Sequence, residues 1–134
     1  MNDVVKEARE WVDTPFRHQG RLKGVGCDCL GLIRGVYGNV YSPSILPKDR
    51  TNYGIEIVVD LNKHLRKVAV EVAEREPGDL ILMKFSSQPT HMGIYVGDDR
   101  MIHAYSSVGR IVEHRISSQW KKRIVSIWRM TWPK

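Results

Sequence analysis

The sequence contains few cysteines, and this scarcity excludes two kinds of stabilised scaffold. Only Cys27 and Cys29 are present among 134 residues, and a single residue separates them. That spacing is too short for an ordinary unstrained disulfide, so the chain has no disulfide framework. A CxC pair without a second pair at ligand spacing also argues against zinc, and we expect no metal and no other cofactor.

Long apolar runs are missing as well. No stretch of eighteen apolar residues occurs, which argues against membrane insertion. The alternating charges of Asp3, Lys6 and Glu7 stand where a signal peptide would have its apolar core. We therefore expect a chain that has no signal peptide and is made in a cytoplasm, with export by assembly into a larger particle or by lysis left open.

What the chain does have is the composition of one folded domain with excess positive charge. Hydrophobic residues make up 42% and charged residues 27%, so we treat residues 1–134 as a single domain. The net charge of +6 favours an anionic polymer without saying which. The basic run 121–123 lacks the context of a nucleic-acid module, so we interpret it as a solvated face and expect no nucleic-acid specificity.

Helical patterns come first along the chain. Apolar residues recur at helical spacing over residues 2–12 and again over 29–39, where Asp28 is a good N-cap. The polar, glycine-rich residues 16–26 between them are interpreted as a loop. Residues 55–65 suit either a strand or a helix, and we interpret them as a helix.

The second half is rich in short β-type runs separated by turn signals such as EPGD and GDD. Helices followed by adjacent strands predict an α+β fold with a C-terminal antiparallel sheet. The predicted strands are 68–72, 79–85, 91–96, 101–105, 110–114 and 123–130.

Cys29 is the candidate nucleophile because it occupies the first turn of the second predicted helix. A thiol attacks as thiolate, and a helix N-terminus or a nearby imidazolium lowers its pKa. Backbone N–H groups at a helix start can also donate to the oxyanion that forms when sulfur attacks a carbonyl. The alternative is that Cys29 is a small buried residue on a capped helix.

Two histidines in HMGIYVGDDRMIHAY complete a possible catalytic set. On a strand, His91 points away from the apolar face. If residues 97–99 form a three-residue hairpin loop, Gly93 pairs with His103 and the two histidines lie diagonally on one face, where His103 could orient His91. A two-residue loop would put them on opposite faces.

The remaining histidines lack such a context. His18 precedes the cysteine in a loop and could line a cleft, although an exposed position is the alternative. We interpret His64 and His114 as surface residues.

These motifs resemble those of the NlpC-type cell-wall cysteine peptidases. GCDCLGLI resembles their DCSGL nucleophile motif, EPGDLIL their strand-opening motif and HMGIYVGDDRMIHA their HVGIYLGNGKFIHA hairpin, in the same order from TPFRHQG onward. The resemblance implies a papain-like α+β fold and hydrolysis of a peptide bond in bacterial peptidoglycan, usually between D-γ-glutamate and a diamino acid. By position it makes Cys29 the nucleophile, His91 the base and His103 the orienting residue.

The strings GCDCLGL and FRHQ resemble most the phage branch of this family, whose short domains are encoded among tail genes. This implies incorporation into a phage or phage-like tail, with peptidoglycan stem peptides as substrate and other tail-tip or hub proteins as partners.

Two positions depart from the family pattern. Phe16 replaces the tyrosine of TPY, and Leu30 replaces the serine that follows the nucleophile. The missing tyrosine hydroxyl is a donor that could contribute on the order of a few kcal/mol to transition-state stabilisation. Phe16, His18, Asp28 and Leu30 are our candidate substrate-contacting residues.

Two other functions stay open. One is a structural tail component with little or no activity, against which the complete triad argues. The other is a thiol-dependent amidase or acyltransferase, which related folds permit and which a deep lipid-accepting groove would favour.

Overall fold

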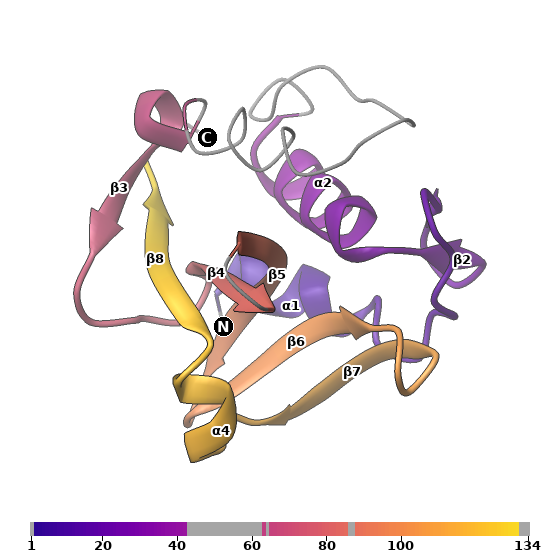
Figure 1. Ribbon diagram of the computed structural model, residues 1–134. Coiled ribbons are helices and arrows are strands. Elements are labelled where there is room, and N and C mark those ends of the chain that lie inside the picture. Colours follow the sequence, from indigo (N-terminus) through magenta and orange to yellow (C-terminus); the bar gives the residue numbers. More distant parts are fainter. Residues whose placement is uncertain (1, 43–62, 64, 86–87, 132–134) are drawn as a thin grey trace.

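The computed structural model describes residues 2–42, 63, 65–85 and 88–131, in which helices precede one large sheet (Figure 1). The helix predicted over 55–65 lies almost entirely outside these ranges, as does His64. Every helix of the described ranges is too short or too polar to cross a membrane.

The observed elements follow the predicted α+β order. The helices with defined bounds are α1 (Asp3–Arg9), α2 (Cys29–Val40) and the short α4 (Ser118–Lys121), and the described residues 63 and 65–68 are helical as well. The strands are β1 (Arg21–Leu22), β2 (Gly26–Cys27), β3 (Ala69–Val72), β4 (Leu80–Phe85), β5 (Gln88–Gly97), β6 (Arg100–Tyr105), β7 (Arg110–Arg115) and β8 (Ile124–Met130).

Side-chain caps start both long helices. The Asn2 carboxamide oxygen accepts the N–H of Val4 at 2.8 Å, and Asp28 Oδ1 accepts the N–H of Gly31 at 2.9 Å. Both bonds satisfy donors that a helix leaves without an internal partner. The predicted start of α2 is thus confirmed, whereas α1 ends at Arg9 because residues 10–13 continue as turns.

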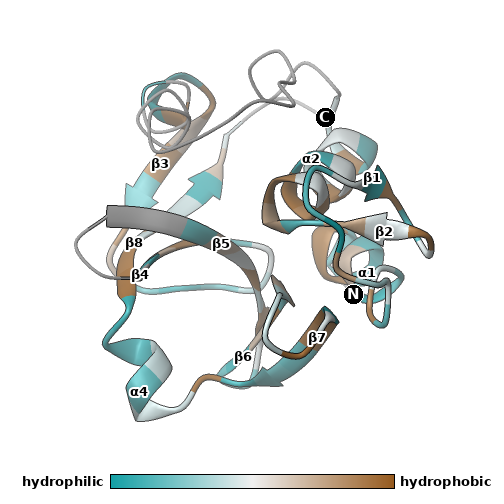
Figure 2. Ribbon diagram, turned by 45° about the vertical axis from the view of Figure 1, so that its right-hand side comes forward, coloured by the Kyte–Doolittle hydropathy of each residue, from teal (hydrophilic) through white to brown (hydrophobic). Residues whose placement is uncertain are grey.

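The six large strands form one antiparallel sheet in the order β3-β8-β4-β5-β6-β7. Helices α1 and α2 lie together on one side of this sheet, and α4 lies between β7 and β8 (Figure 1). Apolar stretches are brown along α1 and α2 in Figure 2, whereas α4 is mostly teal. The predicted class, helices packed on a C-terminal antiparallel sheet, is confirmed.

Alternation along β4 divides the buried residues between two clusters. Leu80 and Leu82 point to the helix side and join the larger cluster, while Ile81 and Met83 join a smaller one on the other face. Because both faces are buried, β4 is a central strand of the molecule.

The predicted loop over residues 16–26 contains more order than expected. Strands β1 and β2 pair there as a small hairpin, with Arg21 opposite Cys27, and Phe16 forms a parallel bridge to Cys27. The expectation of an irregular loop was wrong because the glycine-rich run closes a tight turn that brings two short strands together. Strand β2, which precedes the candidate nucleophile, is therefore paired with β1 on one side and with Phe16 on the other.

The β5–β6 hairpin reaches the predicted register by an unpredicted route. The loop has only two residues, Asp98 and Asp99, with φ of 53° and 60°. A bulge at Val96 adds one residue to β5, and Ile94 then pairs with Ile102, as a three-residue loop would give. The expectation that a two-residue loop would separate the histidines was therefore wrong, because the bulge restores the register.

Candidate active site

Cys29 stands at the first position of α2, and Asp28 fixes that helix start to the preceding loop. Besides capping the helix, the buried Asp28 carboxylate accepts the N–H of Gln19 at 2.8 Å and the guanidinium of Arg21 at 3.0 Å. A carboxylate that satisfies donors from both segments holds them in one geometry. The backbone at Cys29 is therefore held in a fixed position, and the residue is partly exposed.

The environment of the Cys29 thiol favours its neutral form. Burial and the nearby Asp28 carboxylate raise the pKa of Cys29 to about 12, although backbone N–H groups of Met92, Leu30 and Cys29 itself act in the opposite direction. The lowered thiol pKa expected from the helix N-terminus alone is thus wrong. The same N–H groups converge on the sulfur, where an oxyanion would also form.

His91 and His103 are brought together as predicted. His91 Nε2 lies 2.7 Å from His103 Nδ1, and the rings meet edge to face. Burial, together with the charge of Arg123, lowers the pKa of His91 to about 4; burial and the neighbouring histidines lower the pKa of His103 to about 2. Both rings are therefore neutral at neutral pH.

Gly93 leaves the space that this pairing needs. A Cβ atom there would lie 3.1 Å from Met83 Cε, 3.2 Å from the Ile102 carbonyl oxygen and 3.3 Å from His103 Cβ. These are tighter than ordinary contacts, so a side chain at this position would push against His103. The expectation that Gly93 makes room for the rings is confirmed.

Cys29 and His91 line one cavity of about 510 Å³. Its walls are mixed rather than apolar, with a permanent charge contributed by Arg123. The other described residues lining it are Phe16, Ala104, Tyr105, Ser106, Ser107 and Arg123.

Of the four predicted substrate contacts, Phe16 is the one among the residues that line the cavity. Phe16 lines the cavity, whereas His18 is exposed in the loop beside it. Asp28 and Leu30 are 4% and 6% exposed and lie inside the helix start. Substrate contact by these residues stays a prediction, and Asp28 has a positioning role that the structure makes plain.

Two residues at the site were not expected there. His114, predicted to be a surface residue, places its Nε2 atom 2.7 Å from His103 Nε2. Arg123, from the basic run predicted to be a solvated face, lines the cavity and lies against the ring of Trp120. Lys121 and Lys122 are exposed as predicted, whereas Arg123 and His114 are half-buried, because strand pairings across intervening loops decide their positions.

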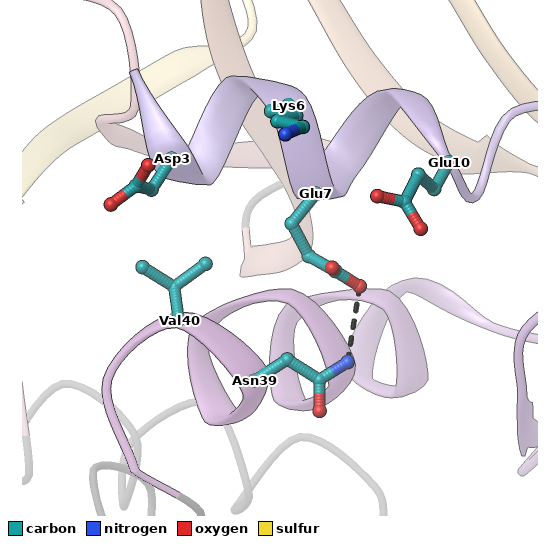
Figure 3. Close-up of a pocket in the computed structure, with 6 residues that line it drawn as sticks. All are labelled: Asp3, Lys6, Glu7, Glu10, Asn39 and Val40. Carbon is teal, nitrogen blue, oxygen red and sulfur yellow. Dashed lines mark hydrogen bonds between the residues drawn. The ribbon is translucent and has the colours of Figure 1, made fainter. Parts of the chain in front are cut away.

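A second hollow lies between α1 and α2 and is lined by Asp3, Lys6, Glu7, Glu10, Asn39 and Val40 (Figure 3). Glu7 accepts hydrogen bonds there from Asn39 at 3.0 Å and from Trp11 at 2.9 Å. Although burial acts to raise its pKa, these bonds and Lys23 lower the pKa of Glu7 overall. These contacts therefore connect the two helices.

The described ranges contain no group of three His, Cys, Asp or Glu side chains suited to a metal.

A thiol at a helix start, facing a cavity shared with a buried histidine pair on an antiparallel sheet, defines the papain-like class of cysteine peptidases. The model of the NlpC/P60 family matches residues 13–129, and the chain belongs to this family.

Curated relatives carry cell-wall or glutamyl hydrolase names. The chain is 26% identical over 121 residues to "Murein DD-endopeptidase MepS/Murein LD-carboxypeptidase" of Escherichia coli, covering 90% of the chain and 57% of the relative. It is 27% identical over 124 residues to "Gamma-DL-glutamyl hydrolase" of Bacillus subtilis, covering 87% and 27%. The chain thus spans about half the length of the first relative, and about a quarter of the second.

Solved structures share the fold. An NlpC/P60 family protein from Bacillus cereus superposes with a TM-score of 0.70 at 20% identity, over 96% of the chain and 39% of that protein. RipD from Mycobacterium tuberculosis superposes with a TM-score of 0.62 at 16% identity, over 96% and 95%, and is described as a non-catalytic NlpC/p60 domain protein adapted to peptidoglycan binding.

Proposed function

We propose that the protein is a cysteine peptidase that hydrolyses a peptide bond in bacterial peptidoglycan. Cys29 is the nucleophile, His91 the general base and His103 the residue that orients His91. One observation carries this proposal: a buried 2.7 Å contact between His91 and His103, on the wall of a cavity that also contains Cys29.

The resting charges determine how the reaction begins. With a neutral thiol and a neutral imidazole, the proton leaves sulfur as the sulfur attacks the substrate carbonyl, and His91 receives it. A C–S bond forms, and N–H groups around the sulfur stabilise the oxyanion. His91 then gives its proton to the amine as the peptide C–N bond breaks, which leaves a thioester on Cys29. Water, deprotonated by His91, attacks the thioester; the C–S bond breaks, the acid product leaves, and His91 returns the proton to sulfur.

The charge of the cavity favours a substrate that carries a carboxylate. Arg123 is the permanently charged side chain among the described residues of its wall. A guanidinium binds a carboxylate through two parallel hydrogen bonds, which gives both affinity and orientation. Peptidoglycan stem peptides carry such groups, and we propose the bond between D-γ-glutamate and a diamino acid as the one cleaved. The glutamyl hydrolase name of one relative supports this choice, and the murein DD-endopeptidase name of another makes a D,D bond the alternative.

Mass spectrometry of purified peptidoglycan after incubation with the protein tests the function. The wild-type protein should release fragments with new termini at one bond, and Cys29→Ala should release none. Cys27→Ala is the matched control, because Cys27 is also a cysteine beside Asp28 but is fully buried in β2. Cleavage lost in both variants would point to damaged folding, and intact wall with all three proteins would contradict the proposal.

The same samples separate the alternative functions. A protein that binds wall without cleaving it would sediment with peptidoglycan and leave it intact, as the description of RipD suggests for that relative. A thiol-dependent acyltransferase would accumulate an acylated Cys29 and pass the acyl group to an added amine. The polar and charged residues of the cavity wall favour a peptide over a lipid chain.

We further propose that the protein acts in a phage or phage-like tail, where it would open the wall during DNA injection. This rests on the strings GCDCLGL and FRHQ, which resemble the phage branch of the family. Mass spectrometry of purified particles should then find the chain at a few copies each. Its absence from particles, together with its presence in the producing cell's envelope, would overturn this assignment.

A further inference from the structure

We propose that His114 is a positioning residue that sets the tautomer of His91 through His103. The inference rests on the proposed function, in which His91 is the base. Nothing in the family resemblance assigns a role to a histidine at this position.

Three hydrogen bonds connect the rings to a backbone carbonyl. His91 Nε2 lies 2.7 Å from His103 Nδ1, and His103 Nε2 lies 2.7 Å from His114 Nε2. His114 Nδ1 lies 2.8 Å from the carbonyl oxygen of Arg115. Both ring nitrogens of His103 are thus used by other imidazoles, in a chain that ends on an atom that can only accept.

That terminal carbonyl decides where every proton of the chain lies. Because the Arg115 oxygen accepts, His114 Nδ1 carries a hydrogen, and a neutral His114 therefore presents Nε2 as an acceptor. His103 must then donate from Nε2 and accept at Nδ1. His91 in turn donates from Nε2, which leaves its Nδ1 as the nitrogen with the lone pair, the atom needed to take the thiol proton.

Packing prevents the central ring from escaping this arrangement. His103 is fully buried, so water cannot replace a lost partner. Tyr105 stacks on it with centroids 5.2 Å apart, and Trp120 meets it edge to face at 4.9 Å. Trp120 also packs against His114 at 5.4 Å, so one indole holds both rings.

The three hydrogen bonds can also be donated in the opposite direction. A substitution that reverses them therefore tests the proposal. A residue at position 114 that can only donate would make His103 accept at Nε2 and donate from Nδ1. His91 would then accept at Nε2 and carry its hydrogen on Nδ1, where it cannot take the thiol proton. His114→Lys provides such a donor, whereas His114→Glu provides an acceptor on a side chain of similar reach.

The experiment is long-range ¹⁵N–¹H correlation NMR of the imidazole rings at neutral pH, with Cys29→Ala as background so that the thiol does not influence the protons. Loss of one signal set in His91→Gln assigns His91. We expect the Nε2–H tautomer of His91 with His114 or Glu at position 114, and the Nδ1–H tautomer with Lys. The same tautomer in the Glu and Lys proteins would overturn the proposal.

Enzyme kinetics provide the second readout, in proteins that retain Cys29. His114→Lys should lower kcat by about 10²- to 10⁴-fold with little change in KM, and His114→Glu should retain most activity. If His114→Lys fails to fold, the spectrum of the protein with His114 still tests the proposal. A hydrogen on Nδ1 of His91 in that spectrum would contradict the proposed direction of the hydrogen bonds. If the tautomer switches as expected but peptidoglycan is never cleaved, the positioning role stands and the proposed function fails.

Discussion

The guanidinium carbon of Arg123 lies 4.7 Å from the ring centroid of Trp120, and Arg123 lines the same cavity as Cys29 and His91. Its backbone carbonyl accepts the N–H of Lys84 at 2.8 Å. The ring contact fixes the guanidinium and the backbone contact fixes the strand start that carries it. The charge of Arg123 acts on His91 and helps to lower its pKa.

Replacing Arg123 should weaken the binding of substrates that carry a carboxylate. A hydrogen bond to a charged group contributes about 1.5–3 kcal/mol, so Arg123→Gln should raise KM for a wall peptide by about 10- to 100-fold. Arg123→Lys keeps the charge but loses the planar fork, and its KM should be intermediate. Steady-state kinetics on a soluble stem peptide provide the measurement.

The matched control for that prediction is Arg110→Gln. Arg110 is exposed and pairs with Asp13 at 3.2 Å outside the cavity, so its loss should leave KM unchanged. An equal rise of KM in both variants would mean that the overall positive charge, and not Arg123, attracts the substrate.

The reactivity of Cys29 should depend steeply on pH. Because burial and Asp28 raise its pKa to about 12, the thiolate fraction increases about tenfold per pH unit across the neutral range. Alkylation of Cys29 by iodoacetamide, followed by peptide mass spectrometry from pH 5 to pH 9, should show this slope. A plateau below pH 8 would instead indicate a preformed thiolate–imidazolium pair.

Acid should destabilise the fold through its buried histidines. The pKa values of His91 and His103 are lowered from 6.5 to about 4 and about 2. Below pH 6.5, and down to these lowered values, the unfolded protein therefore binds more protons at the two histidines than the folded protein does. Their contribution to stability is fully present above pH 6.5 and is lost as pH falls below it. From pH 7 to pH 5 the loss is about 2 kcal/mol per histidine.

Urea unfolding at the two pH values measures this effect. The variant with both His91→Gln and His103→Gln should show a flatter dependence on pH than the wild-type protein. Unfolding free energies that are equal at pH 7 and pH 5 in the wild-type protein would show that the two rings are not held neutral.

Gly93→Ala should impair both stability and activity. The added methyl group would press on His103 and Met83, which typically costs about 1–3 kcal/mol where a core is already filled. Displacement of His103 should also lower kcat if His103 orients His91 as proposed. Thermal unfolding and kinetics with one preparation measure both effects. A variant with unchanged melting temperature and kcat would mean that the rings can shift without consequence.

Much of the catalytic geometry was predictable because it is local. The cap at Asp28 and the apolar stripe of α2 placed Cys29 at a helix start, and the two histidines fell on paired strands. The register prediction was correct for the wrong reason, since the bulge at Val96 compensates for a two-residue loop. A bulge leaves no clear trace in hydrophobic alternation, so the sequence offered no signal for it.

The sequence by itself determined the order of helices and strands, the capped helix start at Cys29 and the spacing of the two histidines. These features depend on periodicity, capping and turn residues within short segments. Tertiary structure alone decided that His114 touches His103, through the β6–β7 pairing of Met101 with His114. It also decided that Arg123 reaches the cavity, because β8 inserts between β3 and β4. The first contact depends on the register of the β6–β7 pair, and the second on pairing between strands distant in the chain. Both are set by the burial of whole faces rather than by a local pattern.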